Sequence, residues 1–77
     1  MSAGVIKVKT FATLNTLFPS VPDFPLNEGD CVLDIMNRMG IPPEKVTIIF
    51  INNVHAEVES SLKDGDVLGL FPPIGGG

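Results

Sequence analysis

Hydrophobic and polar residues alternate along the first part of the chain. One set of alternate positions holds Lys7, Lys9 and Phe11, and the other set holds Ile6, Val8 and Thr10. A period of two is typical of a strand with one buried face, so the segment 5–11 is predicted to be such a strand. Because lysine side chains favour solvent, Phe11 is expected to point outward with them.

A spacing of three and four residues follows between positions 31 and 39. The apolar residues with this spacing are Val32, Ile35, Met36 and Met39. They would form one stripe along a helix, which we predict from Cys31 to about Met39. Asp30 is the expected N-cap. Gly40 is the expected left-handed residue at the other end, and the two prolines beyond it forbid continuation.

Three later apolar runs predict strands, at Val46–Ile51, Val54–Val58 and Val67–Phe71. The first run is nearly continuous, so this strand is expected to be buried on much of both faces. Asn52 and Asn53 predict a tight turn after it, because asparagine tolerates the left-handed conformation. An Asp-Gly turn at 62–66 is expected before the last strand.

Prolines weaken the regular structure between the first strand and the helix. Ala12–Phe18 is predicted to form a short helical turn, and Phe18–Asp23 is predicted to be a loop. Phe24–Asn27 is predicted to be a short strand. Pro25 indicates that this strand lies at an edge of the sheet or is irregular, because proline cannot donate a hydrogen bond to a neighbouring strand.

The order of elements is that of an α+β domain, with one main helix on one face of a mixed sheet of four or five strands. A helix that crosses such a sheet predicts the β-grasp, or ubiquitin-like, fold. The chain has 77 residues and no internal repeat, so residues 1–77 are expected to form a single domain. Residues 72–77 are expected to be a flexible tail, and the free protein is expected to be a monomer.

Composition and charge narrow the classes of function. Charged residues make up 18% of the chain and hydrophobic residues 44%, so some apolar surface is expected to be kept for partners. The net charge is −4 and the five basic residues do not cluster, which argues against nucleic-acid binding and favours a basic partner. No apolar run approaches the ~20 residues of a membrane span. We therefore expect a cytoplasmic protein.

The chain ends in the sequence FPPIGGG, at positions 71–77. A terminal carboxylate has a pKa of about 3.3–3.7, so it is ionised at pH 7 and is a poor electrophile. The chain has no glycine-rich nucleotide motif, so activation must come from another protein. Glycines lack Cβ and can enter a narrow channel, while Pro72 and Pro73 stiffen the exit from the domain.

Residues 62–77, LKDGDVLGLFPPIGGG, resemble the end of the MoaD/ThiS sulfur carriers. Their pattern is L-x-D-G-D-x-V-x-x-F-P-P-V-x-G-G, and Leu68 and Ile74 stand here at its two valine positions. The opening strand is similar too, as is Ile51-Asn52-Asn53, although Asn53 replaces the usual glycine. The resemblance covers nearly the whole chain. The F-P-P element favours the molybdopterin type over the thiamin type, and the third glycine is a variation.

The resemblance implies a protein co-substrate and not an enzyme. An adenylating enzyme would use ATP and Mg²⁺ to convert the Gly77 carboxylate to an acyl-adenylate, and a sulfur donor would then replace AMP to leave a thiocarboxylate. In the molybdopterin type, the tail enters the larger catalytic subunit of molybdopterin synthase, with Gly75 and Gly76 in the narrow part of the channel. In the thiamin type, the sulfur goes into a thiazole. The carrier itself is expected to bind no cofactor or metal.

Strand alternation also predicts a docking surface. In the strand 67–71, Leu68 and Leu70 take the inward face, so Phe71 points outward. A β-grasp sheet would bring Phe11 beside it and form an exposed apolar patch next to the tail. The residues expected to bind partners are Phe11, Phe71, Pro72, Pro73 and Ile74.

Other reactive side chains have simpler interpretations. Cys31 is expected to be a small buried side chain, and one cysteine excludes an internal disulfide. Asp64 and Asp66 flank a turn glycine, which accounts for both carboxylates. A solvated strand face, and not a metal site, is expected for His55, Glu57 and Glu59.

Two other functions stay open at this point. A ubiquitin-like modifier would use the same activated tail to form an amide with a target lysine. Only covalent adducts in cells would separate it from a sulfur carrier. A plain interaction domain would not need the tail at all.

Overall fold

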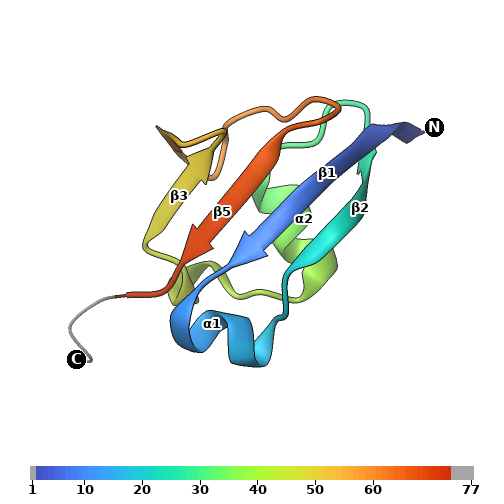
Figure 1. Ribbon diagram of the computed structural model, residues 1–77. Helices are drawn as coiled ribbons and strands as arrows, with labels where there is room; N and C mark the ends of the chain where they lie inside the picture. Colours follow the sequence, from blue (N-terminus) through green and yellow to red (C-terminus); the bar gives the residue numbers. More distant parts are fainter. Residues whose placement is uncertain (1, 74–77) are drawn as a thin grey trace.

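The computed structural model describes residues 2–73 of the protein, with side chains from residue 4 onward. Five strands form one mixed sheet in the order β2-β1-β5-β3-β4, and helix α2 lies across one face of it (Figure 1). The elements are β1 (Ser2–Thr10), α1 (Ala12–Leu17), β2 (Val21–Asn27), α2 (Val32–Met39), the 3-10 helix η1 (Pro43–Lys45), β3 (Ile48–Ile51), β4 (Val54–Ala56) and β5 (Val67–Phe71). This arrangement confirms the predicted α+β, β-grasp fold.

The last strand of the chain lies at the centre of the sheet. β5 pairs with β1 in parallel and with β3 in antiparallel orientation, while β2 and β4 form the two edges. The register places Thr10 beside Leu70 and Ile48 beside Phe71. Because β1 and β5 run in the same direction, both strands end on the same side of the domain (Figure 1).

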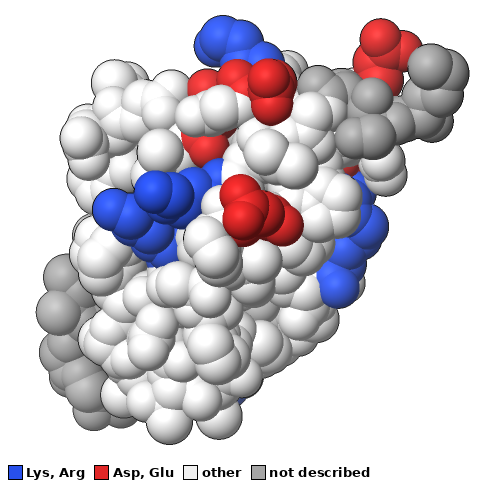
Figure 2. Space-filling view, turned by 45° about the vertical axis from the view of Figure 1, so that its right-hand side comes forward, with Lys and Arg blue, Asp and Glu red and all other residues white. Residues whose placement is uncertain are grey.

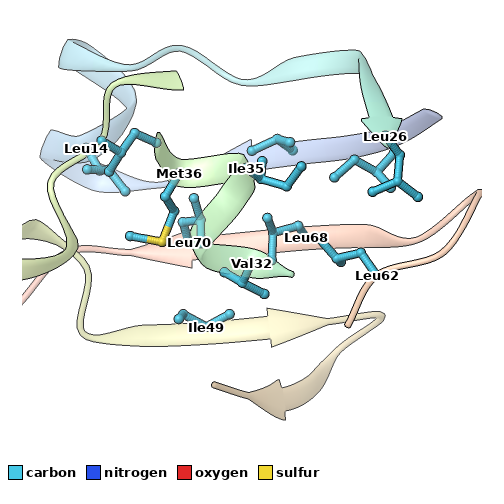
Figure 3. Packing of buried hydrophobic residues seen from close by; sticks show 12 residues of the cluster. Leu14, Leu26, Val32, Ile35, Met36, Ile49, Leu62, Leu68 and Leu70 are labelled. Atoms are coloured by element: carbon cyan, nitrogen blue, oxygen red, sulfur yellow. The ribbon is translucent and has the colours of Figure 1, made fainter. Parts of the chain in front are cut away.

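The hydrophobic core lies between α2 and the inner face of the sheet (Figure 3). It contains the apolar residues that were predicted to face inward from the first and last strands, and most of the predicted helix stripe. Thr10, the third predicted inward residue of the first strand, is also buried. The buried apolar residues are Ile6, Val8, Leu14, Leu26, Val32, Ile35, Met36, Ile41, Ile49, Leu62, Leu68 and Leu70. Met39, at the end of the stripe, packs against this cluster but is only partly buried.

The start of α2 differs from the prediction. Its N-cap is Cys31 and not Asp30, because Asp30 is an ion-pair partner of Arg38, with 2.8 Å between Oδ2 and Nη2. The Asp34 carboxylate accepts a hydrogen bond from the Cys31 backbone N–H at 3.0 Å and lies 3.3 Å from the thiol. Cys31 is therefore half-buried beside a carboxylate, where a buried side chain was expected. Gly40 ends the helix as predicted, with φ of 79°.

Edge strand β2 is longer than predicted, because it begins at Val21 and not at Phe24. Pro22 favoured a loop in the sequence, but an edge strand tolerates a proline whose missing N–H would face away from the sheet. Arg38 fastens α2 to this strand. Its Nη2 donates to the carbonyl oxygen of Pro25 at 2.8 Å, and its guanidinium lies 5.4 Å from the centre of the Phe24 ring.

Strands β3 and β4 are shorter than their apolar runs, since β3 begins at Ile48 and β4 ends at Ala56. The turn between them is as predicted, with φ of 53° at Asn52 and 68° at Asn53. β3 is not buried on both faces. Its residue Phe50 is only partly buried and lies on the outer face of the sheet.

Charged side chains are unevenly distributed over the surface. Positions 10–22 carry none. The lower part of the face in Figure 2, where α1 lies, is accordingly almost free of charge. Within residues 2–73, no helix is long and apolar enough to cross a membrane.

Candidate functional site

The candidate site is the surface around the end of β5, where the chain leaves the sheet. The last two carbonyl oxygens of the strand accept hydrogen bonds from neighbouring segments. Leu70 O accepts from the N–H of Phe11 at 3.2 Å, and Phe71 O accepts from the N–H of Thr47 at 2.9 Å. Pro72 and Pro73 then end the ladder, because proline has no N–H. The domain therefore has a rigid exit point for whatever follows.

Four of the predicted site residues lie outside the described part of the chain: Ile74, Gly75, Gly76 and Gly77. Their predicted roles stay predictions. The predicted partner-binding residues before them are all described. Pro72 is half-buried and Pro73 is exposed, and both line the surface beside α1.

Phe11 and Phe71 lie side by side on the outer face of the sheet, as predicted. Their ring centres are 4.2 Å apart and their planes differ by 3°, so the rings are stacked. The parallel pairing of β1 and β5 produces this contact, because both residues directly follow the paired residues Thr10 and Leu70. Phe11 remains 36% exposed although it is a large apolar side chain.

Two further rings extend this patch, and neither was predicted to belong to it. Phe50 lies edge-on to Phe71, with 5.8 Å between ring centres, and His55 lies edge-on to Phe50 at 6.0 Å. The available signal was the alternation within β3, since Ile49 faces the core and its neighbour must face outward. We call Phe11, Phe50, Phe71 and His55 the aromatic patch.

Three hollows adjoin the exit point. One of about 290 Å³ lies beside the two prolines and is lined by Thr13, Leu14, Leu17, Glu44, Lys45, Pro72 and Pro73. A second, of about 320 Å³, opens between β1 and β2 on one side of Phe11. The third, of about 100 Å³, lies inside the aromatic patch over Gly69. The first and third hollows are lined by the end of β5 or by the prolines after it, and the second lies farther along β1.

Two cations stand beside the aromatic patch. Lys7 and Lys9 are exposed on the outer face of β1, and the register places them opposite Val67 and Gly69. Within the described residues, neither lysine forms an ion pair. The outer face of β1 therefore presents two cations next to the aromatic patch, although the whole chain has a net charge of −4.

The two carboxylates of the Asp-Gly turn have structural partners, as predicted. Asp64 accepts a hydrogen bond from the N–H of Val5 at 2.9 Å. Asp66 is buried and accepts one from the side-chain amide of Asn52 at 2.9 Å. The carbonyl oxygen of that amide accepts from the N–H of Val67, also at 2.9 Å. These bonds fix the beginning of β5, and therefore the position of its other end.

The remaining titratable groups do not gather into a second site. His55 Nδ1 and Glu57 Oε2 are 3.9 Å apart and both side chains are largely exposed. Among residues 2–73, no three side chains of histidine, cysteine, aspartate and glutamate are placed to hold a metal ion. The hydrogen bond from Arg38 holds the pKa of Asp30 below its ordinary value, against the opposing effect of burial.

Comparison with known proteins gives the family. The model of the ThiS family matches residues 8–77, which is most of the chain. The matched segment includes both stacked rings, Phe11 and Phe71. The chain belongs to the ThiS family. Proteins of the ThiS and MoaD type are small sulfur carriers and not catalysts themselves. No curated protein matches the chain in sequence.

Solved structures that resemble this ThiS-family chain include the following two. One is described as "Putative molybdopterin converting factor, subunit 1" from Pyrococcus furiosus. It is 29% identical over 92% of this chain and 99% of its own, with a TM-score of 0.69. The other is the Haloferax volcanii HVO 2177 protein, 18% identical over 96% of this chain and 87% of its own, with a TM-score of 0.76. The second likeness shows the fold alone.

Proposed function

We propose that this protein is the sulfur carrier of molybdopterin biosynthesis, and that its reactive group is the carboxylate of Gly77. An adenylating enzyme joins a carboxylate oxygen to the α-phosphorus of ATP with the help of Mg²⁺, and pyrophosphate leaves. Sulfide released by a sulfur donor then attacks the carbonyl carbon, and AMP leaves as the C–S bond forms, so that a thiocarboxylate remains. The carrier works in the cytoplasm and binds no cofactor of its own.

The observation that carries this proposal is the family match, which continues through the glycines to residue 77. The choice of molybdopterin rests on the Pyrococcus furiosus neighbour and on the F-P-P element at positions 71–73. The division of labour is also sensible chemically. The chain offers a carboxylate but no nucleotide motif, so a partner must supply ATP and the energy of activation.

The described exit point supports a threading role for the tail. Five residues from Pro73 to Gly77 span at most roughly 16–18 Å when extended, enough to reach a buried site while the domain stays outside. The hydrogen-bonded end of β5 and the two prolines limit where such a tail can start. A fixed starting point reduces the entropy that is lost when the partner binds.

We further propose that the aromatic patch and the two prolines form the docking surface for the adenylating enzyme and for the larger molybdopterin synthase subunit. Stacked, exposed aromatic rings are typical of the centres of protein interfaces. The patch adjoins the exit point, and this position supports the proposal because a partner that receives the tail would come close to it. The carrier is a monomer until it meets these partners.

The test of this function uses the purified adenylating enzyme from the same genome. We expect the wild-type chain to support ATP–pyrophosphate exchange and, with a sulfur source, to gain about 16 Da, the difference between sulfur and oxygen. Deletion of Gly76 and Gly77 withdraws the carboxylate by about 7 Å and should abolish exchange. Gly76→Val adds a branched side chain to a backbone-sized channel and should reduce exchange sharply.

Both tail variants should melt at the wild-type temperature, which serves as their control for folding. Full exchange by the two-residue deletion would contradict the proposed function and leave an interaction domain as the better account. Deletion of Gly77 alone asks whether the third glycine is needed. Ladders of covalent adducts in cells would instead identify a ubiquitin-like modifier.

The thiamin-thiazole pathway is the second candidate, because the matching family model is that of ThiS. Reconstitution decides between the two. The thiocarboxylate form should convert a cyclic pterin precursor when it is mixed with a molybdopterin synthase catalytic subunit. Sulfur transfer to thiazole and not to the pterin would reverse the assignment.

A further inference from the structure

Gly69 occupies a position where the fold does not require glycine. It lies in the middle of β5, and its φ is not among the positive values that favour glycine elsewhere in the chain. An added Cβ would meet Phe11 Cε2 at 3.6 Å, and Phe50 Cβ and Phe71 Cε1 at 3.8 Å. These are ordinary contact distances. Glycine in the interior of a strand also weakens it, so its presence here calls for another reason.

The absent side chain leaves the hollow of about 100 Å³ inside the aromatic patch. Gly69 is buried at its floor, and the residues that line it are Lys9, Phe11, Phe50, Asn53, Val67, Gly69 and Phe71. A cavity of about 150 Å³ accommodates a benzene ring, so this smaller hollow suits a single aliphatic side chain. Rings on several sides would give such a side chain close packing.

The charge at the rim of the hollow indicates which charge a binding partner would place next to the inserted side chain. Lys9 is the one charged residue among the described residues of the lining. Its ammonium forms no ion pair with a described carboxylate, and Lys7 stands two residues away on the same face. A facing surface that placed a cation here would be repelled, and one that placed a carboxylate would be attracted.

We propose that the hollow over Gly69 receives one aliphatic side chain of the adenylating enzyme, and that a carboxylate of the same enzyme lies beside it against Lys9. This inference rests on the proposed function, because it names how that partner is recognised. The partner surface inferred here also differs from the basic partner that the net charge of the whole chain favours. An acidic chain as a whole suits a basic partner, whereas this face of it suits an apolar one with an acidic rim.

Gly69→Ala is the sharpest test, because it adds one methyl group at the floor of the hollow without a steric conflict. In ATP–pyrophosphate exchange, we expect the KM for the carrier to rise about tenfold while kcat changes little, as when a hot-spot contact is lost. The thermal melt should be unchanged or slightly higher. Val54→Ala changes an exposed apolar side chain outside the hollow and should leave KM unaltered.

The charge at the rim is tested by Lys9→Glu with Lys63→Glu as its matched control. Both variants change the net charge equally, but Lys63 does not line the hollow. We expect Lys9→Glu to raise KM several-fold at low salt, with a smaller effect at high salt because ions screen the rim charge. Lys63→Glu should change KM much less at either salt concentration.

The outcomes separate the inference from the function beneath it. Absence of exchange by the wild-type chain would overturn both. If the wild type supports exchange and Gly69→Ala has an unchanged KM, only the proposed binding role of the hollow would be overturned. Phe11 and Phe71 would then merely cover the glycine backbone. If sedimentation shows that the wild type forms a dimer and Gly69→Ala does not, the occupant is a second copy of the chain and the assignment to the enzyme is wrong.

Discussion

Leu70 and Phe71 are neighbours in β5, yet their side chains lie on opposite faces of the sheet. Leu70 is fully buried between the sheet and α2, whereas Phe71 is half-buried and stacks on Phe11 at the surface. The inner face is mostly aliphatic and is covered by the protein's own helix. The outer face is aromatic, and no described helix covers it. One strand therefore serves two purposes, because alternation separates stability from recognition.

Leu70→Ala should cost more stability than any truncation on the outer face. Truncation of a fully buried leucine leaves a cavity and lowers the free energy of unfolding by about 2–5 kcal/mol. Chemical denaturation measures this loss. Any surviving folded fraction should bind the adenylating enzyme normally, because the outer face is untouched. A loss below about 1 kcal/mol would contradict the burial of this face.

Asp66→Ala should have the next largest effect, because it tests the bonds that fix the start of β5. Its carboxylate is buried and accepts hydrogen bonds from the N–H of Lys63 and from the side chain of Asn52. Leaving these donors unpaired should cost about 1–3 kcal/mol in denaturant unfolding. Asp64→Ala is the control, since this carboxylate is exposed where Asp66 is buried, so the loss of its bond from the N–H of Val5 should cost less.

Arg38→Met should lower the free energy of unfolding by about 1–2 kcal/mol at pH 7, since it removes a charged hydrogen bond from Asp30. The pKa of Asp30 is lowered in the folded protein. The ion pair therefore stabilises the folded state fully at pH values above the ordinary carboxyl pKa of about 3.9. This contribution is lost as the pH falls through the lowered value. The wild type and Arg38→Met should therefore converge in acid, which denaturation at pH 7 and pH 2–3 will show. Lys63→Met is the matched loss of an unpaired cation, and its effect should be small at both pH values.

Phe71→Ala and Phe11→Ala should change stability least and docking most. Each removes a stacked ring from the surface, and an aromatic pair contributes about 0.5–1.5 kcal/mol. Titration with the adenylating enzyme should show a loss of affinity well above that amount. Large losses of stability with unchanged affinity would mean that the two faces have been assigned the wrong way round.

The sequence predicted the features that are determined by local signals, meaning residues that are close to one another in the chain. The bounds of the last strand, the end of the helix at Gly40 and the turn at Asn52 and Asn53 agree with the structure, because strand alternation and left-handed residues are local signals. The outward placement of Phe11 and Phe71 was also predictable, since alternation gives their face and the fold gives their neighbourhood.

The sequence did not predict features that depend on distant partners. Asp30 is a good N-cap by type, but Arg38 holds it and Cys31 takes its place. Pro22 favoured a loop at Phe18–Asp23, because the local sequence does not show that the edge strand extends back to Val21. The hollow over Gly69 needs the rings of Phe50 in β3, Phe71 in β5 and Phe11, which directly follows β1. Phe50 belongs to a run that was predicted to be buried on both faces.

The central position of β5 also has a mechanical consequence. A partner that pulls on the chain beyond Pro73 applies its force along β5, which is bonded to β1 on one side and to β3 on the other. The strand can slide only if both ladders are sheared at once, because the load runs along the strands and perpendicular to their hydrogen bonds. Traction on the tail is therefore resisted by many bonds together, and the domain can act as a firm handle while its end is drawn into an enzyme.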